Sequence, residues 1–107
     1  MSEVQCLRIR LAPGRTDEVA DFLRGLRNRA DEVQEALKAE GILEETLFLD
    51  RTAEEDCLVF FTRARDLAAA AAAFQSSQLP LDVETRELIA DTWQEVRALE
   101  LLVDLEG

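Results

Sequence analysis

The feature that most constrains this chain is a pair of breaks, Pro13-Gly14 and Gly41, which enclose about 25 residues compatible with a helix. Residues 4–11, before the first break, alternate apolar and polar side chains, and this period of two is typical of a strand. A second strand pattern covers residues 42–51, directly after Gly41. Proline lacks a backbone donor and glycine readily adopts left-handed conformations, so both interrupt regular structure. The breaks therefore predict strand, helix and strand in the first half of the chain.

The segment between the breaks has the spacing of one amphipathic helix. Thr16 is a suitable N-cap, and Asp17 and Glu18 follow it in the first turn, where the helix dipole favours acidic side chains. Lys38 lies in the expected last turn, and Gly41 is a natural left-handed stop. The apolar residues recur three and four positions apart and form one stripe: Val19, Phe22, Leu23, Leu26, Ala30, Val33 and Leu37.

The next segments predict a hairpin followed by a short helix. Residues 57–63 form an apolar strand pattern, and the charged turn at 52–56 joins them to the strand at 42–51. Asp66 can cap a helix over residues 67–76, whose run of alanines has high helix propensity.

The end of the chain allows two interpretations. Leu79-Pro80 breaks the alanine-rich helix, and Asp82 can cap a third helix that continues through Val96. Apolar residues then alternate with other residues, which predicts a final strand over 97–105: Leu99, Leu101, Val103 and Leu105. The same residues 97–105 could also prolong the third helix.

Three stretches resemble a known superfamily: Arg-Asn-Arg-Ala-Asp-Glu at 27–32, Leu-Lys-Ala-Glu-Gly at 37–41 and Glu-Glu-Thr-Leu-Phe-Leu-Asp at 44–50. Over about residues 4–95 the chain is similar to an uncharacterised bacterial family of the dimeric α+β barrel superfamily, which includes antibiotic-biosynthesis-type monooxygenases. The resemblance implies one ferredoxin-like α+β domain over residues 1–107, in the order β-α-β-β-α-(α)-β. It also implies an antiparallel sheet in the order 4-1-3-2 with the helices on one face. It implies no reaction, because that family has no known activity.

Composition restricts the possible partners. The formal net charge of −11 would repel nucleic acid and anionic membranes, so we expect neither as a partner. No apolar run approaches the roughly 18 residues that a membrane helix requires, and the first residues do not resemble a secretion signal. We therefore expect a cytoplasmic protein.

Several common chemistries lack the residues that they require. The chain has no His and no Tyr, which excludes His-ligated haem and Ser-His or Cys-His nucleophiles, and its scattered glycines form no phosphate loop. Acidic neighbours such as Glu44 and Glu45 point to opposite faces of a strand, so we expect no metal and no cofactor. Cys6 and Cys57 start strands that run in opposite directions, and this separation predicts two free thiols.

The second and third strands predict a homodimer. Cys57-Leu58-Val59-Phe60-Phe61 is apolar on both faces, although an antiparallel strand with one face in water normally alternates apolar with polar residues. An apolar outer face must be covered, and a second copy of the same sheet is the simplest cover. The alternative is a monomer whose tail folds over the sheet.

Charged residues on the first strand add a prediction about that dimer face. If Leu7, Ile9 and Leu11 face the helices, Arg8 and Arg10 lie on the opposite face of the sheet. With a final strand at 97–105, antiparallel pairing brings Arg10 towards Glu100 and Arg8 between Leu102 and Asp104. A buried guanidinium needs such a partner. Arg8, Arg10 and Glu100 are therefore the candidate dimer face.

Two residues are candidates for a cleft between helices and sheet. Trp93, the only tryptophan, either packs in the core or forms the wall of a site for a flat ligand. Arg29 either lies on a solvated helix face or binds an anion. We expect a homodimeric module of unknown function that either binds a small hydrophobic molecule or only dimerises. The alternative is a cofactor-independent oxygenase or isomerase acting on a hydrophobic small molecule in that cleft, with catalytic residues unknown.

Overall fold

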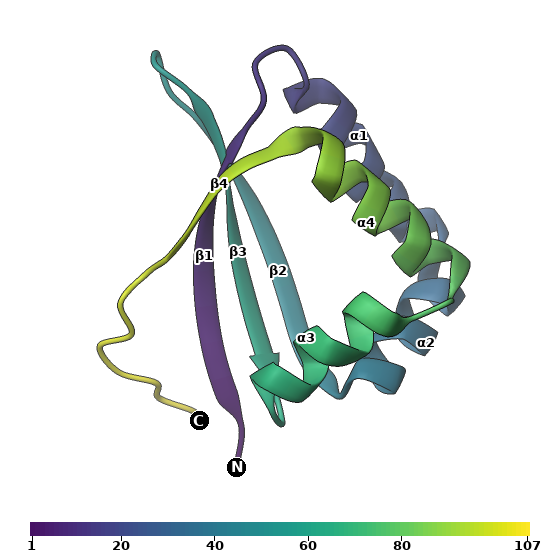
Figure 1. The fold of residues 1–107 in the computed structure, drawn as a ribbon. Coiled ribbons are helices and arrows are strands. Elements are labelled where there is room, and N and C mark those ends of the chain that lie inside the picture. Colours follow the sequence, from purple (N-terminus) through teal and green to yellow (C-terminus); the bar gives the residue numbers. More distant parts are fainter.

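The computed structural model describes residues 1–107 and contains one four-stranded sheet with the helices on a single face (Figure 1). The strands are β1 (Glu3–Leu11), β2 (Ile42–Arg51), β3 (Asp56–Ala64) and β4 (Trp93–Ala98). The helices are α1 (Thr16–Gly25), α2 (Ala30–Glu40), α3 (Leu67–Ser76) and α4 (Pro80–Thr92), and a 3-10 turn, η1 (Leu26–Asn28), follows α1. The sheet order is β2-β3-β1-β4, and all neighbours are antiparallel. The predicted fold class and strand order are confirmed.

The helix predicted over residues 16–40 is divided into α1 and α2. The chain leaves the helical conformation at Arg29, where φ is −127° and ψ is 38°. Gly25 and Asn28 have lower helix propensity than their neighbours, and the Arg29 guanidinium donates to Glu32 in the first turn of α2. The apolar spacing continues through the break, and for this reason the periodicity alone predicts one helix.

Two of the expected helix boundaries are confirmed. Gly41 ends α2 in the left-handed region, with φ of 70°, where a residue with a Cβ would be strained. Asp66 caps α3, because its carboxylate accepts a hydrogen bond from Ala69 N at 3.0 Å. Both boundaries follow from local backbone chemistry, which the sequence shows directly.

The predicted caps Thr16 and Asp82 are wrong. Arg15 precedes α1, and Thr16 Oγ1 instead donates to Asp56 Oδ2 at 2.7 Å, joining the start of α1 to the start of β3. Helix α4 begins at Pro80, so Asp82 lies inside its first turn, where it is buried. Both side chains make tertiary contacts in place of local caps.

The fourth strand begins earlier than the sequence pattern predicts. Strand β4 starts at Trp93, directly after α4, and pairs with β1 so that Trp93 lies opposite Leu11. The indole ring packs edge-on against Phe60, with ring centroids 6.4 Å apart. The helix ends at the residue before this contact. The alternative that residues 97–105 prolong the third helix is wrong, and the predicted strand holds only for residues 97 and 98, at the end of β4. Residues 99–107 form a tail without regular structure, although Leu99 N still donates to Cys6 O at 2.9 Å.

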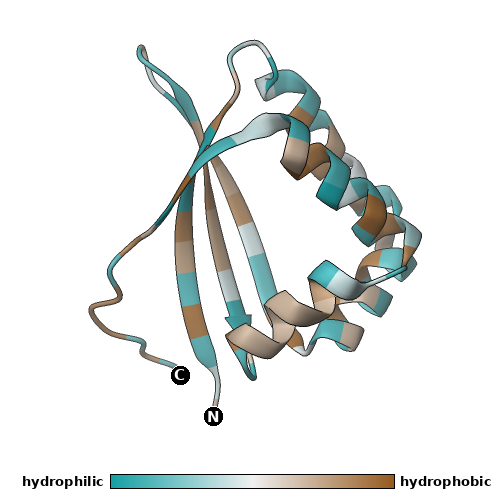
Figure 2. Ribbon diagram, viewed as in Figure 1, coloured by the Kyte–Doolittle hydropathy of each residue, from teal (hydrophilic) through white to brown (hydrophobic).

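The core lies between the sheet and the helices. Ile9, Leu11, Val19 and Leu58 are its buried centre, and Val19 brings α1 onto β1 and β3. Figure 2 shows apolar and polar residues alternating along β1. Leu7, Ile9 and Leu11 face the helices as expected, which leaves the opposite side of the sheet, here called the open sheet face, without helices (Figure 1).

Candidate functional site

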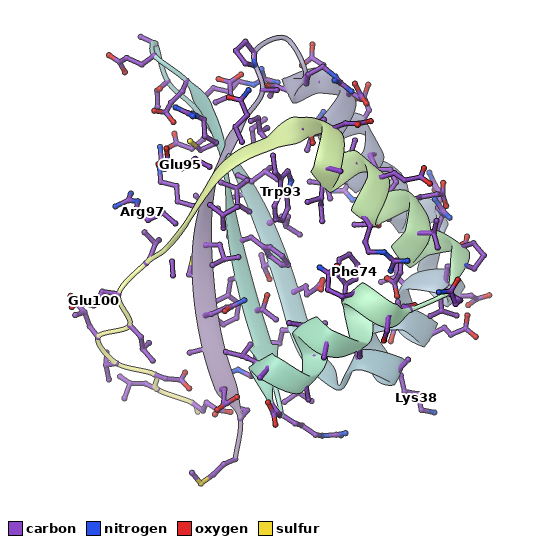
Figure 3. All side chains as sticks on the ribbon, in the orientation of Figure 1. Lys38, Phe74, Trp93, Glu95, Arg97 and Glu100 are labelled. Atoms are coloured by element: carbon purple, nitrogen blue, oxygen red, sulfur yellow. The ribbon has the colours of Figure 1, made fainter.

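The space between the sheet and the helices, here called the inner space, has a wall of aromatic and aliphatic side chains. Phe60 from β3 and Trp93 from β4 contact each other there, and Leu47 from β2 lies opposite Phe60. Figure 3 shows Trp93 and Phe74 projecting into this space from β4 and α3. All these side chains are only partly buried. They pack at the edge of the buried core, and each keeps part of its surface accessible.

Three carboxyl groups from three elements influence one another through charge, and the closest two, Glu40 and Asp82, share a hydrogen bond; the three are called the carboxyl cluster. Glu40 is the last residue of α2, Asp82 lies in the first turn of α4, and Glu45 is on the helix face of β2 opposite Thr62. Glu40 and Asp82 are only 8% and 4% exposed. Glu40 Oε2 and Asp82 Oδ2 are buried without a hydrogen-bond partner. Two adjacent buried carboxylates lack a donor, which one shared proton would supply.

The electrostatics of the cluster are unusual for acidic side chains. Burial, together with the hydrogen bond and charge of Asp82, raises the pKa of Glu40 to about 8. Glu45 is solvent-accessible, yet the surrounding protein excludes enough water to raise its pKa to about 7. The negative charge of Asp82 also contributes to this shift. The cluster thus holds titratable protons near neutral pH.

The sequence contained a signal for this cluster that was missed. Glu45 occupies the apolar phase of β2, two residues before Leu47, and a charge at such a position is unexpected. Glu40 follows Ala36 by four residues and so lies on the buried side of α2. The prediction that Glu44 and Glu45 diverge is confirmed, because Glu44 pairs with Arg63 on the open sheet face.

The two expected cleft residues are not brought together. Arg29 Nη2 lies 2.8 Å from Glu32 Oε2 and 2.5 Å from Glu84 Oε2, so this guanidinium joins α2 to the start of α4. Trp93 lies nine residues beyond Glu84, roughly 13 Å away along α4. Because both acidic partners compensate the charge of Arg29, its side chain has a structural role in linking the two helices.

The expected pairing of Arg10 with Glu100 is wrong. Arg8 and Arg10 do lie on the open sheet face, but β4 places Glu95 opposite Arg10, with Nη2 and Oε2 3.9 Å apart. Arg8 Nη1 donates to Asp50 Oδ2 of β2 at 2.9 Å, across the intervening strand β3. Glu100 lies beyond the end of β4. The error follows from the early start of the fourth strand.

The open sheet face combines apolar side chains with paired charges. Phe48 is 62% exposed there, and Val59 and Phe61 beside it are partly exposed. The tail crosses one end of this face, where Arg63 Nη2 donates to Asp104 Oδ1 at 2.8 Å. A hollow of about 380 Å³ lies between tail and sheet, lined by Val4, Gln5, Cys6, Phe61 and residues 99–103. The tail therefore covers part of the face and leaves Phe48 uncovered.

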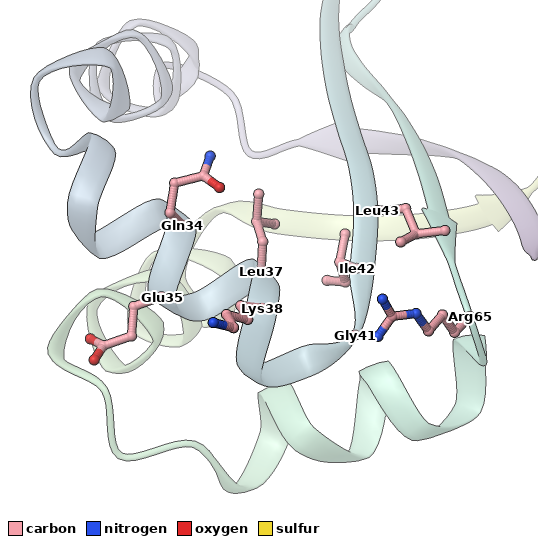
Figure 4. Close-up of a pocket in the computed structure, with 8 residues that line it drawn as sticks. All are labelled: Gln34, Glu35, Leu37, Lys38, Gly41, Ile42, Leu43 and Arg65. Carbon is pink, nitrogen blue, oxygen red and sulfur yellow. The ribbon is translucent and has the colours of Figure 1, made fainter.

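A second, larger groove lies outside the fold, at the edge of β2 (Figure 4). It measures about 460 Å³ and is lined by Gln34, Glu35, Leu37, Lys38, Gly41, Ile42, Leu43 and Arg65. Lys38 and Arg65 bring positive charge, but Glu35 and the carbonyl end of α2 bring negative charge to the same place. This mixture favours no single class of ligand, and we give the groove less weight than the inner space.

Cys6 and Cys57 are free thiols, as predicted from their strand directions. Cys57 lies opposite Arg10 and Cys6 opposite Phe61, so four residues of β1 separate the two positions. Burial raises the pKa of Cys57, which disfavours its reactive thiolate form. No group of three or more His, Cys, Asp or Glu side chains could hold a metal ion. None of the helices is both long enough and apolar enough to span a membrane.

Comparison with solved structures shows which proteins share this fold. Among solved structures, the chain is similar to an L-rhamnose mutarotase from Formosa agariphila, with a TM-score of 0.65, 20% identity, and coverage of 97% of this chain and 99% of that one. It is also similar to a putative antibiotic biosynthesis monooxygenase from Bacteroides thetaiotaomicron, with a TM-score of 0.62, 19% identity, and coverage of 99% and 92%. These likenesses confirm the expected fold.

The particular family is one without a known role. The family model described as "Family of unknown function (DUF6176)" matches residues 2–107, and the chain belongs to this family. A comparison with curated proteins gave no match. The family and the fold therefore leave the function to be argued from the site.

Proposed function

We propose that this protein is a homodimer that binds a small, largely apolar molecule in the inner space. The observation that carries the proposal is the group formed by Leu47, Phe60 and Trp93, which packs at the edge of the buried core and stays only partly buried. Small-molecule sites are mostly apolar and contain a few polar groups that fix orientation. The carboxyl cluster supplies such groups on the same side of the sheet.

The dimer part of the proposal rests on the open sheet face. Phe48 is 62% exposed, with Val59 and Phe61 beside it, and a contiguous apolar patch on a sheet marks an interaction surface. A second copy related by a two-fold axis would cover this patch with the same patch. Light scattering at micromolar concentration should give twice the 12.0 kDa chain mass. A particle of the chain mass would contradict the dimer.

The ligand part of the proposal has a direct test. Native mass spectrometry of freshly purified protein should show a retained small molecule that denaturation releases. Because Trp93 is the only tryptophan, its fluorescence reports on the inner space, and titration with 2-phenylethanol should shift its emission. The absence of both a retained molecule and an emission shift at millimolar 2-phenylethanol would refute binding in the inner space.

A second candidate function is that of a cofactor-independent isomerase. The carboxyl cluster favours it, because carboxyl groups whose pKa values lie near neutral pH can donate and accept protons during catalysis. A mutarotase and a putative monooxygenase share the fold, which shows that such a scaffold accommodates enzymes. Incubating the retained molecule in D₂O should introduce deuterium with the wild type and not with Glu45→Gln. No incorporation with either protein would contradict catalysis.

The proposed location is the bacterial cytoplasm. Two free thiols in a chain of 107 residues are typical of a reducing compartment. Fractionation of cells that express the full protein, followed by detection in the cytoplasmic fraction, tests this part. Recovery from the periplasm or the medium would contradict it.

A further inference from the structure

The tail is fixed at two points on the open sheet face. Leu99 N donates to Cys6 O at 2.9 Å, and no later residue of the tail makes a backbone–backbone hydrogen bond to the sheet. The second fixed point is Asp104, whose Oδ1 accepts from Arg63 Nη2 at 2.8 Å. The side chain of Arg63 is only 12% exposed, so this anchor is well buried. Residues 100–103 therefore bridge two anchors on the same face (Figure 1).

These anchors hold the tail without burying its apolar side chains. Leu101, Leu102 and Val103 are 60%, 84% and 66% exposed. Beneath them lies the hollow of about 380 Å³ described above, here called the tail hollow, whose floor includes Cys6 and Phe61. Exposed apolar side chains gathered around an apolar hollow mark an interaction surface.

The lining of the tail hollow suits an apolar side chain better than a polar small molecule. Its two polar residues are Gln5 and Glu100. Gln5 has the same phase on β1 as Leu7, which faces the helices, and Glu100 is exposed to solvent. Small-molecule sites usually contain a few polar groups that fix the ligand, and neither residue serves in this way here. Because an apolar cavity of on the order of 150 Å³ already holds benzene, the hollow has room for a phenyl ring.

The same face carries a phenyl ring that its own chain leaves uncovered. Phe48 is 62% exposed and is the only aromatic residue among the exposed large apolar side chains. It lies on β2 opposite Val59, whereas the hollow lies over β1, with β3 between them. Two strand spacings separate the ring from the hollow, roughly 10 Å, which is too far for insertion into the hollow of its own chain. A two-fold axis that lies in the interface between ring and hollow places each ring over the hollow of the other copy.

Charge on this face also favours a second copy over another protein. Two chains with a net charge of −11 repel each other unless they meet where charge is compensated. The open sheet face meets this condition, because Arg8 pairs with Asp50 and Arg63 pairs with Glu44. A basic partner protein would find no excess of negative charge among these pairs.

The area that a stable dimer buries requires the tail as well as the strands. A standard interface buries about 800 Å² on each partner. Phe48, Val59 and Phe61 alone supply only part of this area, and each aliphatic side chain of the tail adds on the order of 100 Å². An interface that includes the tail therefore reaches the usual size, and a partner centred on the strands alone does not.

We propose that the tail hollow receives Phe48 of a second copy, so that each subunit inserts this ring between the tail and the sheet of its partner. Aromatic side chains that fill a pocket contribute much of the energy of many interfaces. This inference rests on the proposed dimer and specifies its anchor residue and its docking pocket. It also gives the tail a role, because the tail forms one wall of that pocket.

Photocrosslinking tests the contact in the full chain. Phe48→p-benzoylphenylalanine keeps an aromatic ring at this position and, on irradiation, links it to groups that it touches. We expect a band of twice the chain mass on a denaturing gel. Tryptic digestion should show the peptide of residues 39–51 joined to residues 1–8 or 98–107, which line the hollow. Leu102→p-benzoylphenylalanine is the reciprocal probe and should mark residues 39–51 of the other chain.

Two tail variants test the pocket without a crosslinker. Leu101→Glu places a charge in the lining of the hollow and should weaken dimerisation on the order of 30-fold, because the charge meets an apolar ring. Leu105→Glu makes the same change in the same tail, at an 83% exposed position outside the lining, and should change dimerisation little. Light scattering over a dilution series measures both, and circular dichroism confirms that both variants fold.

The outcomes separate this inference from the proposed dimer. If the wild type has the mass of a single chain, the dimer is wrong, and the docking of Phe48 is wrong with it. If the wild type is a dimer but neither probe links two chains, the dimer stands and the docking pocket is wrong. The pocket is also wrong if the link joins residues 39–51 of one chain to the same residues of the other, or if Leu101→Glu and Leu105→Glu dimerise equally well.

Discussion

The two faces of the sheet are built from alternate residues of the same strands, yet they treat charge in opposite ways. On the open sheet face, Arg8 lies 2.9 Å from Asp50, and Arg63 lies 2.9 Å from Glu44. On the inner face, Glu45 has no ion-pair partner and lies beside two further acids. Paired charges suit a surface that a partner will cover, because pairing compensates part of the desolvation cost. The inner face therefore keeps acidic charge that no basic side chain of the protein pairs with.

The faces also differ in how their apolar residues are buried. Ile9 on the inner face is fully buried, whereas Phe48 on the open face is 62% exposed. In the single chain, the inner face therefore supplies the folding core, and the open face leaves apolar surface that the proposed dimer would bury. This difference can be tested by substitutions on each face.

The largest effect is expected from the core. Ile9→Ala should lower the free energy of unfolding by roughly 2–4 kcal/mol, because it leaves a cavity among Leu11, Val19 and Leu58. Urea denaturation monitored by Trp93 fluorescence measures the change. Val96→Ala, at a half-exposed position opposite Ile9 on β4, is the matched control and should cost much less. Equal costs would mean that the core is not centred at Ile9.

The next effect concerns association. Phe48→Glu places a charge in the centre of the open apolar patch and should weaken the proposed dimer on the order of 100-fold, because a buried unpaired carboxylate is costly. Light scattering over a dilution series measures the dissociation. Leu43→Glu makes the same change at another exposed apolar position of β2 and should leave the mass unchanged. Loss of the dimer in both variants would argue against this face as the interface.

A smaller effect appears as a pH dependence of stability. The folded state raises the pKa of Glu40 to about 8, so between the ordinary pKa of a glutamic acid and that value the folded state holds a proton that the unfolded chain has lost. Stability must therefore fall as the pH rises through this window. Asp82, Glu45 and Arg86 are the charged groups that influence Glu40. Above about pH 8, Glu40→Gln should be more stable than the wild type by roughly 1–3 kcal/mol, because its amide donates to Asp82 without titrating.

Thermal denaturation at about pH 5, 7 and 9 measures this dependence. Glu35→Gln, at an exposed position on the same helix, is the control and should retain the wild-type slope. A slope that Glu40→Gln leaves unchanged would show that the fall in stability arises elsewhere in the chain.

The smallest effect distinguishes the two arginines of the open face. A double-mutant cycle on Arg8 and Asp50 should give a measurable favourable coupling, because the atoms lie 2.9 Å apart and hydrogen-bond. The same cycle on Arg10 and Glu95, at 3.9 Å and with more exposed side chains, should give a coupling indistinguishable from zero. Equal couplings would indicate that a partner buries both pairs alike.

Local patterns were sufficient for most of the fold. Alternation defined β1, apolar runs beside charged turns defined β2 and β3, and Gly41 and Asp66 marked helix boundaries, because each signal depends only on residues close together in the sequence. Two of the predictions that failed share one reason. Trp93 ends α4 by packing on Phe60, and Asp82 turns from a cap into a member of the carboxyl cluster through its contact with Glu40. Both residues respond to neighbours that are distant in the sequence.

The sequence by itself determined the succession of strands and helices, the two separated thiols and the apolar character of both sides of β3, and its resemblance to a known superfamily implied the strand order and the helices on one face. Only the tertiary structure decided which charges have partners. Arg10 pairs with Glu95 because β4 starts at Trp93, and Glu40, Glu45 and Asp82 meet because α2, β2 and α4 converge. Periodicity assigns a residue to a face, since it depends on backbone geometry alone. The partner of a charged side chain depends on strand register and helix packing. A shift of one or two residues in either moves the side chain by several ångströms.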